Sequence, residues 1–184
     1  MKTFVEIGVC DFNTLEPLLD NGWNGYFAEP IEKYVKRLRD RGAINVSQCA
    51  ISSYTGKLKM YQSKEPDVIN EDNRWQKSIS HAVEQRGTKL LEMESNKNLL
   101  DNIIEVDCFT LQDYFKLYNI SQVDFLKVDT EGHETDIFEV YDWCVKPTFM
   151  KVEHIHVNDK RLTNIFEDQG YLVYTEERDM YAVL

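Results

Sequence analysis

The chain has 184 residues, of which 42% are hydrophobic and 29% charged, and its formal net charge is -11. This length is typical of one domain with a substantial core, and the hydrophobic content excludes an intrinsically disordered chain. Nucleic-acid binding is driven largely by lysine and arginine contacts to phosphates, so the acidic balance disfavours it. We therefore expect a single soluble globular domain, residues 1–184, that acts on a small molecule.

The cysteines and the apolar runs indicate where such a protein works. Its four cysteines are scattered, without a CxxC pair or metal-ligand spacing, which is typical of reduced thiols in a cytoplasmic protein. No apolar run approaches the ~20 residues that cross a bilayer, and the N-terminus enters a core strand without a signal peptide. We expect a cytoplasmic protein with no membrane partner.

Two short strands at the start of the chain each carry an acidic residue at or near their end. Residues 4–8 include Glu6 and end at Gly8, and residues 25–28 lead into Glu29. Glu29 follows Gly8 by about 20 residues, the distance at which an α/β dinucleotide site places a carboxylate on the ribose hydroxyls. This spacing predicts a nucleotide-type site with Glu29 on the ribose.

Helical patterns follow both strands. Thr14, with leucines after it, predicts a short capped helix, and Pro30 and Gly42 bound a second helix at its first turn and just past its end. Basic residues on the second helix alternate with apolar residues at helical spacing, which indicates a solvated outer face.

The middle of the chain is harder to interpret. Residues 44–51 and 57–61 have the pattern of strands, whereas residues 62–102 form a long polar stretch with few strand signals. Long irregular connections in compact domains are usually lids, binding loops or linkers. We expect a lid or acceptor-binding insertion there, containing Ser80 and a candidate base, His81; a mobile surface insertion is the alternative.

The second half alternates helices and strands and ends in a hairpin. Thr110 and Asp113 form the sequence signature of a capping box. The expected elements, in order, are a helix at about 110–118, a strand at 123–128, a helix at 134–142, a strand at 149–155, a helix ending at Gly170 and an antiparallel pair of strands at 171–175 and 180–184.

The most informative segment is 124–134, an apolar strand that runs into carboxylates and a glycine. In open α/β sheets, ligands bind just beyond the carboxyl ends of the strands. This position predicts that Asp129 and Glu131 border an active site. Glu153 and His154 come at the end of the following strand and are expected beside them.

These segments together resemble the FkbM-type family of S-adenosylmethionine-dependent methyltransferases, over nearly the whole chain. Residues 124–134 are similar to the family signature DFLKIDVEGxE, and Glu29 with Pro30 to its EP pair. In the first loop the family has Asp-x-Gly-x-Asn-x-Gly, of which an acid, Glu6, and Gly8 are kept. The resemblance implies an α/β, Rossmann-like class I methyltransferase fold: a mainly parallel seven-stranded sheet, a C-terminal antiparallel hairpin and helices on both faces.

The resemblance also implies S-adenosylmethionine as cofactor and methyl donor, and a small-molecule or glycan hydroxyl, such as that of a sugar, as acceptor; a homo-oligomer is compatible with it. The sulfonium methyl is already activated, so catalysis needs chiefly positioning, with a base to help deprotonate a hydroxyl. Asp129, Glu153 and His154 are the candidate catalytic residues. The residues expected at the cofactor are Glu6, Gly8, Cys10, Asn13, Glu29, Pro30, Ile31, Cys49, Ala50 and Asp129.

Two other classes stay open. The chain could be a metal-dependent hydrolase or a metal-assisted methyltransferase, because carboxylates and imidazoles suit divalent manganese, iron or zinc. Strand alternation would place His154 and His156 on one side and Glu153 on the other. The second class, suggested by the altered first loop, is a cofactor-binding module without activity. In the metal-dependent class, the possible metal ligands are Asp129, Glu131, His133, Glu153, His154 and His156.

Overall fold

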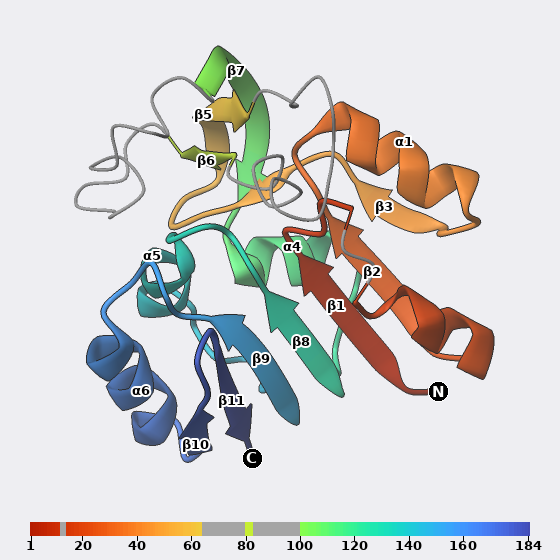
Figure 1. Cartoon of the computed structure of the whole chain (residues 1–184). Helices are drawn as coiled ribbons and strands as arrows, with labels where there is room; N and C mark the ends of the chain where they lie inside the picture. Colours follow the sequence, from red (N-terminus) through yellow and green to blue (C-terminus); the bar gives the residue numbers. More distant parts are fainter. Residues whose placement is uncertain (12–13, 64–79, 83–99) are drawn as a thin grey trace.

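The computed structural model describes residues 1–11, 14–63, 80–82 and 100–184. Figure 1 shows a main β-sheet with helices packed around it and a smaller sheet beyond the arrowheads of its central strands. The main sheet has seven strands in the order β10-β11-β9-β8-β1-β2-β3. The chain therefore has the expected α/β, Rossmann-like architecture.

The main sheet is parallel except for β11, which lies antiparallel between β9 and β10. This confirms the C-terminal hairpin predicted from the sequence. The strands are β1 (Thr3–Ile7), β2 (Asn24–Ala28), β3 (Asn45–Ser47), β8 (Phe125–Val128), β9 (Phe149–Glu153), β10 (Leu172–Thr175) and β11 (Asp179–Val183).

Helices cover both faces of the main sheet, as expected. On one face α1 (Glu32–Asp40) buries Val35 and Leu38 against Phe4 and Phe27. The other face carries α4 (Leu111–Leu117), α5 (Glu134–Glu139) and α6 (Asp159–Asp168), whose apolar residues form one core with the alternate strand residues. Successive strand residues point to opposite faces, so β1, β2 and β8 contribute to both cores.

Two helix ends test the capping predictions. The Thr110 side chain accepts a hydrogen bond from the backbone N–H of Asp113 at 3.3 Å, which confirms the cap at the start of α4. A short helix follows the first strand, as expected, but it is the 3-10 helix η1 (Glu16–Asn21), with Leu15 at the N-cap position and no side-chain cap, so the cap predicted at Thr14 is wrong.

The smaller sheet was not predicted. Its strands, in the order β4-β7-β5-β6, are β4 (Ala50–Ile51), β5 (Gly56–Ser63), β6 (His81–Ala82) and β7 (Leu100–Phe109). Residues 44–51 are therefore not one strand: Ser47 pairs with Ala28 in the main sheet, whereas Ala50 pairs with Cys108 in the smaller one. The chain passes from one sheet to the other within this segment.

The expected insertion at 62–102 begins and ends inside strands of the smaller sheet, since β5 runs to Ser63 and β7 starts at Leu100. Its remainder at 64–79 and 83–99 lies outside the described residues, so the lid stays a prediction. Within the described part of the chain, none of the helices has both the length and the apolar character to span a membrane.

Four strands of the main sheet end at the same edge. Ile7 pairs with Ala28 and with Val128, and Val128 pairs with Val152. The next residues along these strands, Gly8, Glu29, Asp129 and Glu153, therefore form a row at the carboxyl edge of the sheet.

Candidate active site

A cavity of about 450 Å³ opens above this row and extends under the smaller sheet. Parallel sheets bind ligands at such an edge, where the helix that follows each strand begins. Glu131 lines the cavity, as do nine of the candidate catalytic and cofactor-binding residues: Gly8, Cys10, Glu29, Pro30, Ile31, Cys49, Ala50, Asp129 and Glu153.

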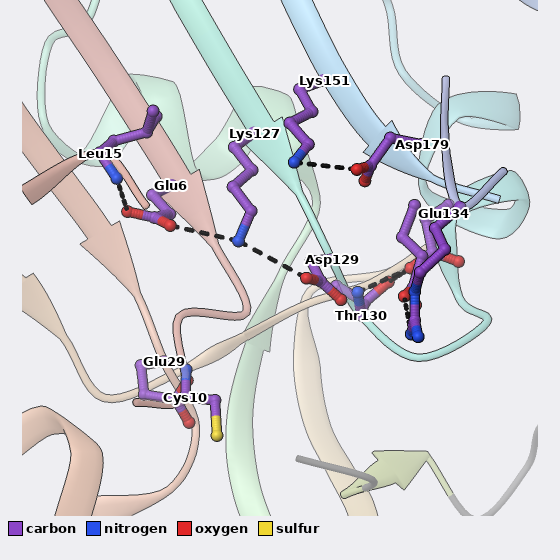
Figure 2. Close-up of polar contacts among 12 residues, drawn as sticks. Glu6, Cys10, Leu15, Glu29, Lys127, Asp129, Thr130, Glu134, Lys151 and Asp179 are labelled. Atoms are coloured by element: carbon purple, nitrogen blue, oxygen red, sulfur yellow. Dashed lines mark hydrogen bonds and ion pairs between the residues drawn. The ribbon is translucent and has the colours of Figure 1, made fainter. Parts of the chain in front are cut away.

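Glu29 organises one end of the cavity. Its Oε2 accepts a hydrogen bond from the backbone N–H of Cys10, which lies beside it in Figure 2, and its Oε1 accepts one from the backbone N–H of Ile31, both at 2.8 Å. Burial raises the pKa of the Glu29 carboxyl to about 7, while the Cys10 and Ile31 N–H groups oppose that shift. Each carboxylate oxygen can accept a second hydrogen bond, so Glu29 can hold the loop and still receive a ligand hydroxyl.

Gly8 is required by the backbone that packs against it. Its φ is +73°, and a Cβ at this position would lie 1.7 Å from the carbonyl oxygen of Asp129. The loops after β1 and β8 can approach this closely only because Gly8 has no side chain. Cys10 follows with φ 48°, also in the left-handed region, and burial raises the pKa of its thiol to about 11.

The smaller sheet supplies an apolar wall. Cys49 and Ala50 line the cavity from the segment that enters this sheet, and Leu58 and Met60 line it from β5. All four are buried. Ile31 lines the cavity as well, so this part of its lining is apolar.

In the cavity lining, Lys127 connects two acids. Its Nζ lies 3.2 Å from Glu6 Oε1 and 3.5 Å from Asp129 Oδ2, with only 5% of the lysine side chain exposed (Figure 2). Burial lowers the pKa of Lys127, but the carboxylates of Glu6 and Asp129 raise it more, so the ammonium stays charged. Glu6 itself is fully buried, and its other oxygen accepts the Leu15 N–H at 3.1 Å. Glu6 thus lies below the cavity and is absent from its lining.

The opposite end of the cavity is acidic. Asp129, Glu131 and Glu153 line it, with Arg178 as the facing cation; its guanidinium lies 3.2 Å from Glu153 Oε1. Burial raises the pKa of the Glu153 carboxyl to about 9, and the negative charges of Asp129 and Glu131 add to this shift. The Asp129 side chain is 31% exposed, so it is the more accessible acid.

The loop between β8 and α5 is held by Glu134. Its Oε1 accepts the backbone N–H of Thr130 at 2.6 Å, and its Oε2 accepts that of Gly132 at 3.1 Å. Between them Glu131 has φ 56°, a conformation that non-glycine residues seldom adopt. The loop therefore turns sharply and places Glu131 in the cavity wall.

The histidines separate into different environments. His133 lines the cavity, and its Nε2 lies 3.0 Å from Ser52 Oγ. His156 Nε2 lies 3.3 Å from Glu131 Oε2. His154, a candidate base, is absent from the cavity lining, and its Nε2 lies 2.9 Å from the carbonyl oxygen of Glu176.

The expected strand at 149–155 ends earlier, at Glu153. A turn follows, in which the Val157 N–H donates to the His154 carbonyl oxygen at 3.2 Å. Strand alternation therefore stops, and the prediction that His156 faces away from Glu153 is wrong. Asn13 lies outside the described residues, and so does the side chain of His81.

Several cavity residues were missed in the sequence: Lys127, Lys151, Arg178, Leu58 and Met60. Lys127 and Lys151 interrupt apolar strands, and a buried lysine needs a carboxylate partner. Those partners, Glu6 and Asp179, come from other strands. The lysines were a signal that sequence reasoning could have used, whereas Arg178 becomes visible only once the hairpin lies beside β9.

The fold and the row of residues define a Rossmann-like domain with a cavity at the carboxyl edge of its sheet. The model of the methyltransferase FkbM domain matches residues 5–173. The chain therefore belongs to the FkbM methyltransferase family, as its residues indicated. Comparison with curated proteins and with solved structures gave no match.

Proposed function

We propose that the protein transfers a methyl group from S-adenosylmethionine to a hydroxyl oxygen of a small molecule or glycan. The single observation that carries the proposal is one cavity with Glu29 at one end and the Asp129 carboxylate at the other. S-adenosylmethionine is the donor that the family generally implies, and its ribose and adenine suit Glu29 and the apolar wall formed by Cys49 and Ala50.

The chemistry asks little of the protein beyond positioning. The acceptor oxygen forms a bond to the methyl carbon while the carbon–sulfur bond breaks, and the sulfur keeps the electron pair as S-adenosylhomocysteine. Holding the two reactants in line can supply roughly 7 to 11 kcal/mol of the barrier. The hydroxyl proton must go to a base within hydrogen-bond reach.

Asp129 is the best candidate for that base. It lines the cavity, its side chain is 31% exposed, and Lys127 fixes one of its oxygens from below. Glu153 is less suited, because it is only 7% exposed and Arg178 already lies 3.2 Å from its Oε1. His154 ranks last, since its ring is bonded to a carbonyl oxygen away from the cavity lining.

The charge of the site bears on the acceptor. The acidic end of the cavity and the net charge of -11 disfavour a polyanionic acceptor, including nucleic acid. A neutral, hydroxyl-rich acceptor such as a sugar is compatible with the acidic cavity and with the net charge. We propose that the protein meets this acceptor in the cytoplasm.

Calorimetric titration with S-adenosylmethionine and S-adenosylhomocysteine tests the cofactor. The second assay follows a labelled methyl group into a panel of sugars and other hydroxyl compounds. We expect both cofactors to bind and label to enter a neutral acceptor. If the cofactors bind but no acceptor is methylated, the cofactor-binding module is favoured. If neither S-adenosylmethionine nor S-adenosylhomocysteine binds, the proposal is overturned.

A further inference from the structure

Three potential metal ligands meet at the acidic end of the cavity. One donor atom each from Glu131, Glu153 and His156 lie within 4.8 Å of one another. They come from the loop after β8, from the end of β9 and from the turn that follows it. The fold therefore brings together groups that strand alternation alone would have separated.

Glu153 provides an independent indication that a ligand belongs there. The residue is only 7% exposed and lines the cavity. Its Oε1 accepts a hydrogen bond from Arg178 at 3.2 Å, but its Oε2 is buried and has no hydrogen-bond partner among the residues that the structure describes. Leaving a buried polar atom unsatisfied costs about 1–3 kcal/mol, and more for a charged group. A cation at this oxygen would remove that cost.

The local balance of charge also favours a cation. Asp129 and Glu131 line the cavity beside Glu153, and both of them, together with the buried Glu134, act electrostatically on Glu153. Arg178 is the cation bonded to Glu153, and Lys127 is already shared between Asp129 and Glu6. Lys151 also lines the cavity, but its Nζ is paired with Asp179 at 2.9 Å, so these carboxyl groups outnumber the basic groups that remain to face them.

We propose that Glu131, Glu153 and His156 bind a divalent first-row transition-metal ion, with Mn²⁺ as the representative probe. Two carboxylates and an imidazole suit manganese, iron or zinc. Bonds of about 2.0–2.2 Å to one ion allow ligand atoms that lie 3.3 Å apart, as His156 Nε2 and Glu131 Oε2 do. The proposal that the ion binds rests on this geometry and does not depend on methyl transfer.

Three protein ligands leave coordination positions open toward the cavity. An acceptor oxygen bound there would lie next to Asp129, and the ion would lower the pKa of its hydroxyl. This role rests on the proposed function and would make the protein a metal-assisted methyltransferase. Binding of the ion and methyl transfer can therefore be tested separately.

The experiment is a titration of the purified protein with Mn²⁺ alone, followed by electron paramagnetic resonance of the free ion and by calorimetry. We expect binding to one site per chain, weakened at least about tenfold by Glu153→Gln or His156→Gln. Glu167→Gln is the matched control, because Glu167 is an exposed acid on α6. This variant should bind Mn²⁺ like the original protein.

Glu131→Gln is a third ligand variant that we expect to stay folded, because Glu131 lies on a loop outside the helices and strands. It should weaken Mn²⁺ binding at least about tenfold while circular dichroism stays unchanged. The proposal is overturned if the original protein does not bind Mn²⁺, or if the folded ligand variants bind it as well as Glu167→Gln does. S-adenosylmethionine titrated into the same samples reports on the proposed function independently.

Discussion

Lys127 and Glu6 form a buried ion pair at 3.2 Å between adjacent central strands, although 121 positions separate them in the sequence. The lysine also reaches Asp129, so the pair supports one of the acids that line the cavity. The stability of the sheet edge and the position of a candidate catalytic group thus depend on the same ammonium.

Lys127→Met should lower the free energy of unfolding by about 3–5 kcal/mol, because Glu6 is left buried without its cation. The double variant Glu6→Gln/Lys127→Met leaves no buried charge and should recover a large part of this loss. Urea unfolding of the single and double variants measures both effects. If the double variant is as unstable as the sum of the singles, the pair does not act as a unit.

Gly8→Ala and Gly22→Ala form a matched pair. Both glycines have similar positive φ, +73° and +76°, but a Cβ at Gly8 would lie 1.7 Å from the Asp129 carbonyl oxygen, whereas one at Gly22 meets nothing within 4 Å. Gly22→Ala should cost about 1–2 kcal/mol for the backbone conformation alone. Gly8→Ala should cost clearly more in thermal or urea unfolding, and equal costs would contradict the close approach.

Glu29→Ala should reduce the affinity for S-adenosylmethionine by about 1.5–3 kcal/mol, the usual size for hydrogen bonds to a charged group. The melting temperature should fall too, because the Cys10 and Ile31 N–H groups lose their acceptor. Calorimetry is therefore performed well below the melting temperature. Glu32→Ala, an exposed acid on α1, is the control. Unchanged affinity in Glu29→Ala would remove the ribose assignment.

Asp129→Asn keeps the shape of the side chain but removes its charge. If Asp129 is the base, methyl transfer should fall about 10²-fold or more, while cofactor affinity changes far less. Asp168→Asn, at an exposed position on α6, should behave like the original protein. Repeating the assay with a chelator distinguishes the roles: activity that is lost and then restored by Mn²⁺ indicates an ion. Wild-type transfer by Asp129→Asn would exclude Asp129 as the base.

Glu134 makes stability depend on pH. Burial raises the pKa of its carboxyl to about 7 from 4.5. Because the folded pKa is the higher one, this contribution to stability is complete below about pH 4.5 and is lost as the pH rises to about 7, by about 3 kcal/mol. Glu134→Gln should lack this decline. Urea unfolding at pH 5 and pH 8 measures it, and parallel pH profiles of the two proteins would contradict the assignment.

Much of the main sheet could be predicted from local patterns. The hairpin at its end and the acids after β2 and β8 are encoded in short segments. The smaller sheet was missed because its pairings are distant, with Ala50 beside Cys108 and Gly56 opposite that same residue. The alternation of Ile104, Val106 and Cys108 with polar residues was available as a strand signal in β7.

Within the site, residues that directly follow a strand were predictable, because the strand end fixes their position. Glu29 and Asp129 belong to this group. His156 does not, since its place beside Glu131 depends on a turn after β9 that breaks the alternation. Arg178 comes from a neighbouring hairpin, so its contact with Glu153 is a product of tertiary structure.

The segment from Ser47 to Ala50 leaves the main sheet and enters the smaller one, and the cavity lies where it crosses. A bound molecule would contact Gly8 and Glu29 at the edge of the main sheet and Leu58 and Met60 in the smaller sheet. It would therefore connect the two sheets. Any separation of the sheets would then first require the molecule to leave. By mass action, occupancy of the cavity would slow the hydrogen exchange of backbone amides in β5 and β7, including those far from the reacting atoms.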